Sequence, residues 1–332
     1  MGPWRARGTD FSYAQDVQAA YASYAVGLGK KLTAALGSRV ERTALRADFR
    51  ASGTALAPRS YSSLLPNGSV NYAFSDTSGL RLAYSRRITR PYIDYLNPFV
   101  DRSNPQNITY GNPELAPELT DAYEISYNTL VHSATVVFSG SVRHTGNAIE
   151  ALRLPTPVAG ITAQTFANVA ATTFYQLTGY GTAKPTPQWE LSGGPDVQYV
   201  LRRTPELDRV RRGFITGIRV DSSYKFPRRI TAQASVSGAL PPPTLQGQGA
   251  ATLYYAVGVK KALLGEQADV TLNLTNPFTN SFPNRSSTTT AFVDEQTTYR
   301  TYPRAVRVSF NYRFGQEAPE RQRKKANNDD LK

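Results

Sequence analysis

Cysteine is absent from this chain of 332 residues, which excludes a disulfide framework, a thiolate metal site and a cysteine nucleophile. The two histidines, His132 and His144, are too few for a multi-histidine metal site. No run of about eighteen apolar residues occurs, so a transmembrane helix is excluded while a membrane-spanning β-barrel stays possible. The segment after Met1 is basic but has no apolar run, so a secretory signal peptide is not predicted.

Acidic residues are outnumbered by basic ones, and the net charge is +13. A basic balance of this size invites a nucleic-acid interpretation, because clustered Lys and Arg neutralise phosphates. Here the arginines are scattered along the chain, often alternating with apolar residues, and the dense basic run is confined to Arg321–Lys325. We therefore predict no nucleic-acid partner.

No catalytic constellation emerges from the remaining polar residues. Glu114, Glu118, Asp121 and Glu124 cluster in the sequence, and a general acid/base pair among them is formally possible. Ordinary ion pairing explains them better, since Glu118 follows a proline in a loop and Glu124 falls on the polar face of a strand. We predict that the protein is not an enzyme and carries neither a cofactor nor a metal.

Alternation with a period of two residues is the strongest pattern in the sequence. Val306, Val308, Phe310, Tyr312 and Phe314 alternate without interruption with polar residues. Segments of this kind run for about ten residues, which suits a tilted strand crossing a hydrocarbon core. The opposite face is rich in Ser, Thr, Asn, Gln and Arg, as a wet interior requires. The pattern predicts an all-β fold, an antiparallel transmembrane β-barrel, with a soluble sandwich or propeller as the alternative.

Short and long connections alternate between the predicted strands, as they do in outer-membrane barrels. The long connections are predicted at residues 48–66, 89–118, 149–162, 203–210, 241–249 and 276–303. About thirteen strands fit the pattern. They are predicted near residues 12–25, 31–47, 67–76, 79–88, 119–130, 134–148, 163–178, 187–202, 211–225, 228–240, 250–262, 267–275 and 304–314.

Residues 84–124 carry a series of short motifs. These are Tyr84-Ser85-Arg86-Arg87-Ile88, Arg90-Pro91, Leu96-Asn97-Pro98-Phe99, Gly111-Asn112-Pro113-Glu114-Leu115, Pro117-Glu118 and Tyr123-Glu124. The series resembles a stretch of TonB-dependent outer-membrane receptors, and above all the outer-membrane β-barrel family common in Bacteroidetes. The last strand, with Phe310, Tyr312 and Phe314, resembles the closing strand whose terminal aromatic is read by the outer-membrane assembly machinery. The likeness covers nearly the whole chain.

The resemblance implies that this chain is the C-terminal part of a receptor barrel. A complete member carries a signal peptide, a plug domain and a box that contacts TonB, and none of these is visible here. We expect residues 1–10 to be the remnant of an outer loop, 11–314 to form the barrel and 315–332 to be a disordered periplasmic tail. About 13 strands of a barrel of about 22 are expected, so the sheet is expected to stay open.

The resemblance also implies a function, the uptake of a scarce solute such as a siderophore or a glycan across the outer membrane of a Gram-negative bacterium. The expected partners are outer-membrane lipid, the assembly machinery, an unidentified solute, and the TonB system acting through a plug. A passive porin or a soluble all-β binding module are the alternatives. Arg81, Arg143, Arg307 and Arg313 are candidate lumen residues, which either pair with acidic residues of the plug or attract anionic solutes.

Overall fold

The computed structural model describes residues 12–49, 54–204, 209–241, 247–290 and 293–314. The expected remnant at residues 1–10 and the expected tail at 315–332 both lie outside these ranges. Strands dominate the described part, and no helix in it is long and apolar enough to cross a membrane. Its one α-helix is α1 (Ile93–Leu96), and a 3-10 turn covers Leu264–Glu266.

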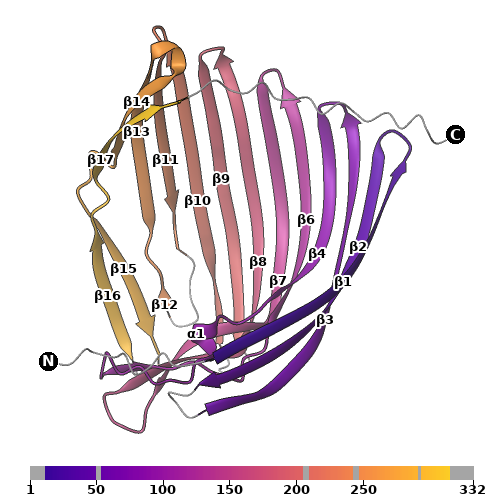
Figure 1. Ribbon diagram of the computed structural model, residues 1–332, viewed down its shortest axis with the longest axis vertical. Coiled ribbons are helices and arrows are strands. Elements are labelled where there is room, and N and C mark those ends of the chain that lie inside the picture. Colours follow the sequence, from indigo (N-terminus) through magenta and orange to yellow (C-terminus); the bar gives the residue numbers. More distant parts are fainter. Residues whose placement is uncertain (1–11, 50–53, 205–208, 242–246, 291–292, 315–332) are drawn as a thin grey trace.

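The main sheet follows the chain strand by strand, in the order β1-β2-β3-β4-β6-β7-β8-β9-β10-β11-β13-β14-β17 (Figure 1). All neighbours on this path are antiparallel, and the short β5 (Asn107–Thr109) joins β8 in parallel off the path. The thirteen-strand prediction is confirmed. The strands are β1 (Ser12–Leu28), β2 (Leu32–Phe49), β3 (Thr54–Ser75), β4 (Ser78–Thr89), β6 (Glu118–Val131), β7 (Ala134–Pro155), β8 (Thr162–Thr186), β9 (Trp189–Thr204), β10 (Arg209–Phe226), β11 (Ile230–Ala239), β13 (Thr252–Leu263), β14 (Ala268–Thr275) and β17 (Ala305–Tyr312).

Connections at the two ends of the sheet differ in length. At the end we call the turn end, tight turns join consecutive strands, and several residues there take the left-handed backbone that such turns require. They include His132 (φ 55°), Arg228 (φ 62°) and Arg229 (φ 60°). The other end, the long-connection end, carries α1, β5 and a second sheet of β12 (Gly247–Gln248), β15 (Phe282–Thr289) and β16 (Asp294–Thr301) (Figure 1).

Several predicted loops are partly strand, which corrects the sequence-based boundaries. β3 begins at Thr54, so the loop predicted at 48–66 is largely a strand. β7 and β8 reach Pro155 and Thr162, which reduces the loop predicted at 149–162 to residues 156–161. This extension contains the buried residues Ala148, Leu152, Ala163 and Ala170, and polar and apolar residues no longer alternate regularly in its sequence.

Two further elements interrupt the loops predicted at 89–118 and 276–303. The first contains α1, although the sequence predicts no helix there, and the second contains the β15–β16 hairpin. Neither element has an amphipathic pattern, since α1 has only four residues and β15 is polar on both faces. Elements of this kind depend on tertiary contacts, and their sequences show no periodic pattern of apolar residues from which they could be predicted.

The faces of the main sheet are chemically distinct. Directly opposed residues share a face, and one row across six strands is apolar or glycine while the adjacent row is polar. The apolar row is Val70, Leu82, Ile125, Gly140, Leu177 and Val197. The polar row is Asn71, Arg81, Ser126, Ser139, Thr178 and Asp196.

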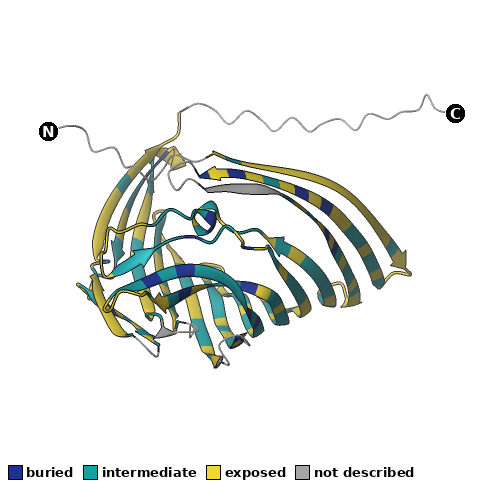
Figure 2. Cartoon of the chain, turned by 90° about the horizontal axis from the view of Figure 1, so that it is seen from below, coloured by how far each residue is buried: buried dark blue, intermediate teal, exposed yellow. Residues whose placement is uncertain are grey.

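The sheet curves so that α1 and its loop lie in its hollow (Figure 2). The helix α1 packs on Ala47 and Phe49 of β2. These two residues lie on the same face of β2 as Thr33, which opposes Asn71 of the polar row. We therefore call the face that carries the polar row the inner face. The opposite, outer face is apolar and uncovered, with Leu177 69% and Val306 69% exposed. A soluble monomer does not expose an apolar surface of this extent, so the outer face requires an apolar surrounding.

Candidate functional site

Polar side chains of the inner face bond to one another across the strands. Arg81 Nη1 donates to Asn71 Oδ1 at 3.0 Å, and the hydroxyls of Ser126 and Ser139 lie 2.9 Å apart. Asp196 accepts from the Thr178 hydroxyl at 2.9 Å and from Gln198 Nε2 at 2.7 Å. The wall therefore presents a hydrogen-bonded, wettable surface to whatever lies in the hollow.

The four candidate lumen arginines do not form one cluster. Arg81 and Arg143 belong to the central wall, on β4 and β7, whereas Arg307 lies opposite Asn273 on the edge strand β17. Arg143 stands over the Phe174 ring at 5.2 Å and donates to Gln176 Oε1 at 3.4 Å. Arg313 follows β17, where its backbone N–H donates to the Gln267 carbonyl at 2.8 Å.

The three predicted assembly residues lie at the end of the edge strand. Phe310 opposes Val270 and Tyr312 opposes Ala268, and the Tyr312 and Phe314 rings meet edge to face with centroids 4.6 Å apart. Phe310 is 63% and Phe314 90% exposed, so these rings make few contacts within the described chain. Their exposure leaves them accessible, and their role in assembly stays a prediction.

The motif residues of 84–124 build a loop that folds into the hollow, and we call residues 90–117 the inserted loop. Leu96 and Leu115, 3% and 5% exposed, pack with Ala47 and Phe49 of β2 in a small hydrophobic core. Tyr95 stacks on Phe166 of β8, with ring centroids 4.1 Å apart. The inserted loop thus bridges two strands far apart in the sheet.

Gly111 and Asn112 hold the centre of the inserted loop. The Gly111 N–H donates to the Asn97 carbonyl at 2.7 Å, and the Asn112 N–H donates to the Tyr95 carbonyl at 2.6 Å. A Cβ on Gly111 would lie 2.6 Å from both acceptor oxygens, which no side chain tolerates. Asn112 then anchors the loop to β8, because its Nδ2 donates to the Phe166 carbonyl at 2.9 Å.

An ion pair fastens the beginning of the inserted loop. Arg90 pairs with Glu41, and its Nη2 donates to the Thr43 hydroxyl at 2.9 Å. Glu41 and Thr43 are 7% and 0% exposed, and Arg39 also bonds Glu41 at 2.6 Å. Breaking the Arg90–Glu41 contact is costly, because the Glu41 carboxylate is buried and would lose a charge-assisted hydrogen bond.

The remaining motif residues lie around the hydrophobic core formed by Leu96 and Leu115. Pro91, Pro113 and Pro117 line a narrow space with Leu96 and Leu115, and Pro98 is half-buried. The Asn97 side chain caps the next turn by accepting from the Phe99 N–H at 3.1 Å. Glu118 accepts from the Ile149 N–H at 2.6 Å and so joins β6 to β7. The structure brings the motif residues together. The residues of β2 and β8 that they contact could not be identified from the sequence.

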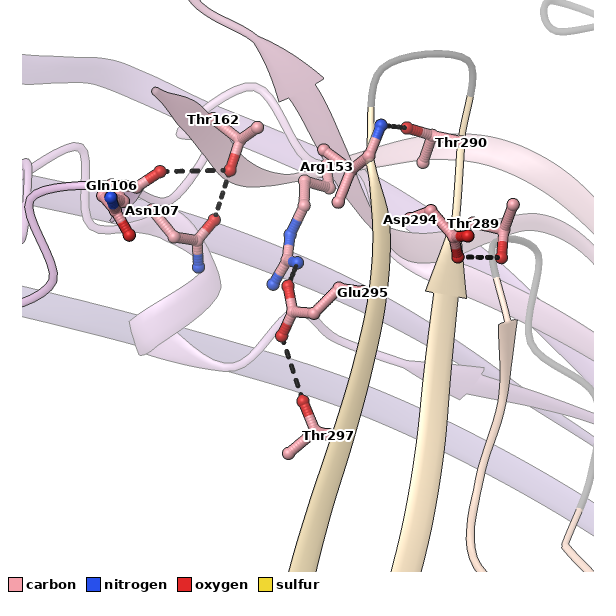
Figure 3. A network of polar contacts seen from close by, with 10 residues as sticks. Gln106, Asn107, Arg153, Thr162, Thr289, Thr290, Asp294, Glu295 and Thr297 are labelled. Atoms are coloured by element: carbon pink, nitrogen blue, oxygen red, sulfur yellow. Dashed lines mark hydrogen bonds and ion pairs between the residues drawn. The ribbon is translucent and has the colours of Figure 1, made fainter. Parts of the chain in front are cut away.

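A cleft of about 620 Å³ opens between the inserted loop and two other connections, and we call it the three-connection cleft. It lies between residues 104–107, residues 155–162 and the start of β16. Thr162 donates to Asn107 Oδ1 at 3.0 Å, and Glu295 pairs with Arg153 and accepts from the Thr297 hydroxyl at 3.0 Å (Figure 3). Thr297 and Arg153 lower the pKa of the Glu295 carboxyl. Amides, hydroxyls and carboxylates dominate its lining.

The part of the chain that the structure describes contains no group of three His, Asp or Glu side chains fit to hold an ion. His144 instead bonds the Thr173 hydroxyl at 2.9 Å. The cleft therefore offers hydrogen bonding and charge.

An open, coiled antiparallel sheet with an apolar outer face and a polar inner face defines a barrel-wall protein. The sequence matches the family model of the outer membrane protein beta-barrel family over residues 3–312, and the chain belongs to this family. The protein is accordingly an outer-membrane protein of the Gram-negative type. No curated protein matches the sequence.

Solved structures of similar fold are receptors and transporters. The FrpB iron transporter from Neisseria meningitidis (F3-3 variant) has a TM-score of 0.62 at 14% identity, with 92% of this chain and 46% of that chain covered. The copper transporter OprC gives 0.67 at 12%, covering 91% and 48%. The siderophore receptor PirA from Pseudomonas aeruginosa gives 0.56 at 10%, covering 80% and 54%. This chain therefore spans about half the length of the structures it matches.

Proposed function

We propose that this chain is the barrel wall of an outer-membrane receptor that takes up a scarce solute by a TonB-dependent mechanism. The inserted loop carries the proposal. It occupies the hollow at the long-connection end and is fixed there by the Arg90–Glu41 pair and the Leu96–Leu115 core. A passive channel needs a continuous open path, whereas a receptor needs a structured mouth that retains its solute.

The similar structures support the solute class, since their titles describe an iron transporter, a copper transporter and a siderophore receptor. The motif series of residues 84–124 supports an origin in Bacteroidetes. Because the chain spans about half of the structures it matches, we assign the energy-coupled step to a plug and a TonB contact outside these residues. The proposed reaction is binding and gated passage, without covalent chemistry.

We assign solute capture to the three-connection cleft and plug contact to the inner face. The cleft is hollow, polar and formed by three connections, which is the arrangement of a binding site on a rigid scaffold. On the inner face, Arg81 and Arg143 offer charge to acidic groups of a plug. Phe314 and its neighbours are assigned to recognition by the assembly machinery.

Uptake in the bacterium that carries the gene tests this proposal, with labelled ferric siderophore, copper and oligosaccharide as probes. Deleting the coding region should abolish uptake of one probe, and a proton uncoupler should do the same in the intact strain. Gly111→Ala should reduce that uptake because it displaces the inserted loop. Gly27→Ala is the matched control, since a Cβ on Gly27 meets nothing within 4 Å.

Two results would contradict the proposal. One is uptake that persists with the uncoupler, and the other is steady ohmic conductance through the purified chain in a planar bilayer. Together they would assign the chain to the passive channels.

A further inference from the structure

An aromatic row crosses the outer face in register. Tyr84 opposes Tyr123, and Tyr123 and Tyr175 both oppose Val142. Tyr199 then lies between Tyr175 and Phe214. Ring centroids are 5.0 Å apart for Tyr84 and Tyr123, and 5.1 Å apart for Tyr199 and Phe214. Tyrosines on the outer face of a barrel lie at the depth of the lipid headgroups, so this row marks the membrane boundary on the long-connection side.

An apolar hollow of about 1170 Å³ adjoins this row on the outer face. Gly140 lies within it, where the missing side chain leaves Ile125 and Leu177 as the nearest walls, 3.4 and 3.5 Å from an added Cβ. The hollow exceeds the size of ordinary ligand pockets, which run to about 1,000 Å³. Its lining includes the aromatic row together with Leu36, Val70, Leu82, Ile125, Leu177 and Val197. A site of this composition fits hydrocarbon chains.

A charged row lies two residues beyond the aromatic row, towards the long-connection end. Arg86 opposes Asp121, which opposes His144 on β7, and the row continues through Thr173 and Leu201 to Arg212. Arg203, also on the outer face, opposes Val210 and Ala171. Among the described residues of this band, three guanidinium groups accompany one carboxylate, so their summed charge is positive.

The Arg86 side chain is held in a fixed position at this boundary. Its Nε and Nη2 donate to the two Asp121 carboxylate oxygens at 2.8 and 2.9 Å, and the Tyr84 hydroxyl donates to Asp121 at 2.7 Å. A guanidinium has five N–H donors, so donors remain for a second anion. Arg86 is 38% exposed and Arg212 is exposed, which leaves both open to the headgroup layer.

We infer that the outer face of β4 to β10 binds a phosphate-bearing lipid of the surrounding leaflet. Its acyl chains occupy the hollow, and its phosphate lies on the arginines beyond the aromatic row. Arginine suits this task because its planar fork donates two parallel hydrogen bonds to phosphate. The inference rests on the membrane location and is independent of the transported solute, so it survives if the receptor proposal fails.

Native mass spectrometry of the full chain, extracted from membranes in mild detergent, measures the retained lipid. Phosphatidylglycerol and phosphatidylcholine are added in turn as probes, and inorganic phosphate is added as a competitor. We expect retained phosphatidylglycerol to exceed phosphatidylcholine. Arg212→Gln and Arg86→Gln should each lower its retention by roughly tenfold, because each removes a charge-assisted hydrogen bond to the phosphate.

Arg81→Gln is the matched control, because Arg81 lies on the same strand as Arg86 but on the inner face, and its lipid retention should equal the wild type. If Arg86→Gln fails to fold, the Arg203→Gln and Arg212→Gln double variant replaces it, because neither side chain takes part in the Asp121 pair. Equal retention of both lipids, equal retention in the outer-face and inner-face variants, or full displacement by inorganic phosphate would each overturn the inference.

Discussion

Two regions of the molecule are stabilised in different ways. One is the wall, by which we mean the main antiparallel sheet. The other is the seat of the inserted loop, by which we mean the core of Ala47, Phe49, Leu96 and Leu115 together with the Arg90–Glu41 pair. In the wall, successive strands share a hydrogen-bonded ladder, and outer side chains such as Phe138, 59% exposed, have no protein layer above them. In the seat, Phe49, Leu96 and Leu115 are buried as in a soluble domain. The outer face of the wall therefore depends on an apolar surrounding, whereas the seat is stabilised by a hydrophobic core within the protein.

The largest expected effect comes from emptying that core. Phe49→Ala should destabilise the seat by about 3–5 kcal/mol, because a buried phenyl ring leaves a cavity that its neighbours fill incompletely. Hydrogen exchange at the Gly111 and Asn112 amides measures the opening free energy of the loop. Phe138→Ala, on the exposed outer face, is the matched control and should leave that exchange unchanged. Equal acceleration in both variants would remove the distinction between wall and seat.

Breaking the buried ion pair should have the next largest effect. Arg90→Gln removes a charge-assisted hydrogen bond from the buried Glu41 carboxylate, which keeps Arg39 as its partner. The loss should cost about 2–3 kcal/mol, the range for a hydrogen bond to a charged group. The same exchange measurement applies, with Arg81→Gln as control because Arg81 bonds only an exposed asparagine partner. An Arg90→Gln loop that exchanges as slowly as wild type would show that apolar packing alone holds it.

A single methyl group sharpens the comparison further. Gly111→Ala should cost about 1–3 kcal/mol in the seat, because its Cβ collides with two backbone carbonyls that have little room to move. In the wall, Gly27→Ala should be neutral or slightly stabilising, since open space surrounds that position. Unfolding by urea compares the two variants, and similar midpoints would contradict this account.

The smallest expected effect concerns pH at the three-connection cleft. The Thr297 hydroxyl and the Arg153 guanidinium hold the pKa of Glu295 below its ordinary value. The stabilisation is therefore complete above the ordinary glutamate pKa of about 4.3 and is lost as pH falls through the lowered folded value. Protection of the β15–β16 amides, taken relative to the intrinsic exchange rate at each pH, should fall on acidification in wild type and change less in Glu295→Gln. The same pH response in both would place its origin elsewhere.

The wall was largely predictable from the sequence, because the alternation of apolar and polar residues determines where its strands form. In the closing segment, Val306, Val308 and Phe310 alternate with polar residues, and a half-buried strand is the local structure that separates them. The strand order then follows from adjacency along the chain, since neighbours in the sheet are joined alternately by a short turn, such as that at His132, and by a longer connection.

The seat was not predictable in this way. The motif residues of the inserted loop mark a special segment, but Phe49, Glu41 and Phe166 look like ordinary strand residues until the fold brings them to it. Ala148 and Leu152 near the end of β7 are buried as well, and the alternation that marks the rest of the strand is lost there. The ion pair of Arg86 and Asp121 on the outer face was also missed from the sequence, because the two residues lie on different strands, β4 and β6, and meet only when these strands pair.

The central claim is that one face of this sheet contacts lipid and the other contacts water. The chain has no cysteine, so single cysteines can be introduced without background. Nitroxide labels on Ile125→Cys and Ser126→Cys, neighbours on β6, report contact with oxygen dissolved in lipid and with a water-soluble nickel complex. We predict that the label at 125 collides mainly with oxygen and the label at 126 mainly with nickel. Equal accessibility to the nickel complex at both positions, or the reverse order, would contradict the account.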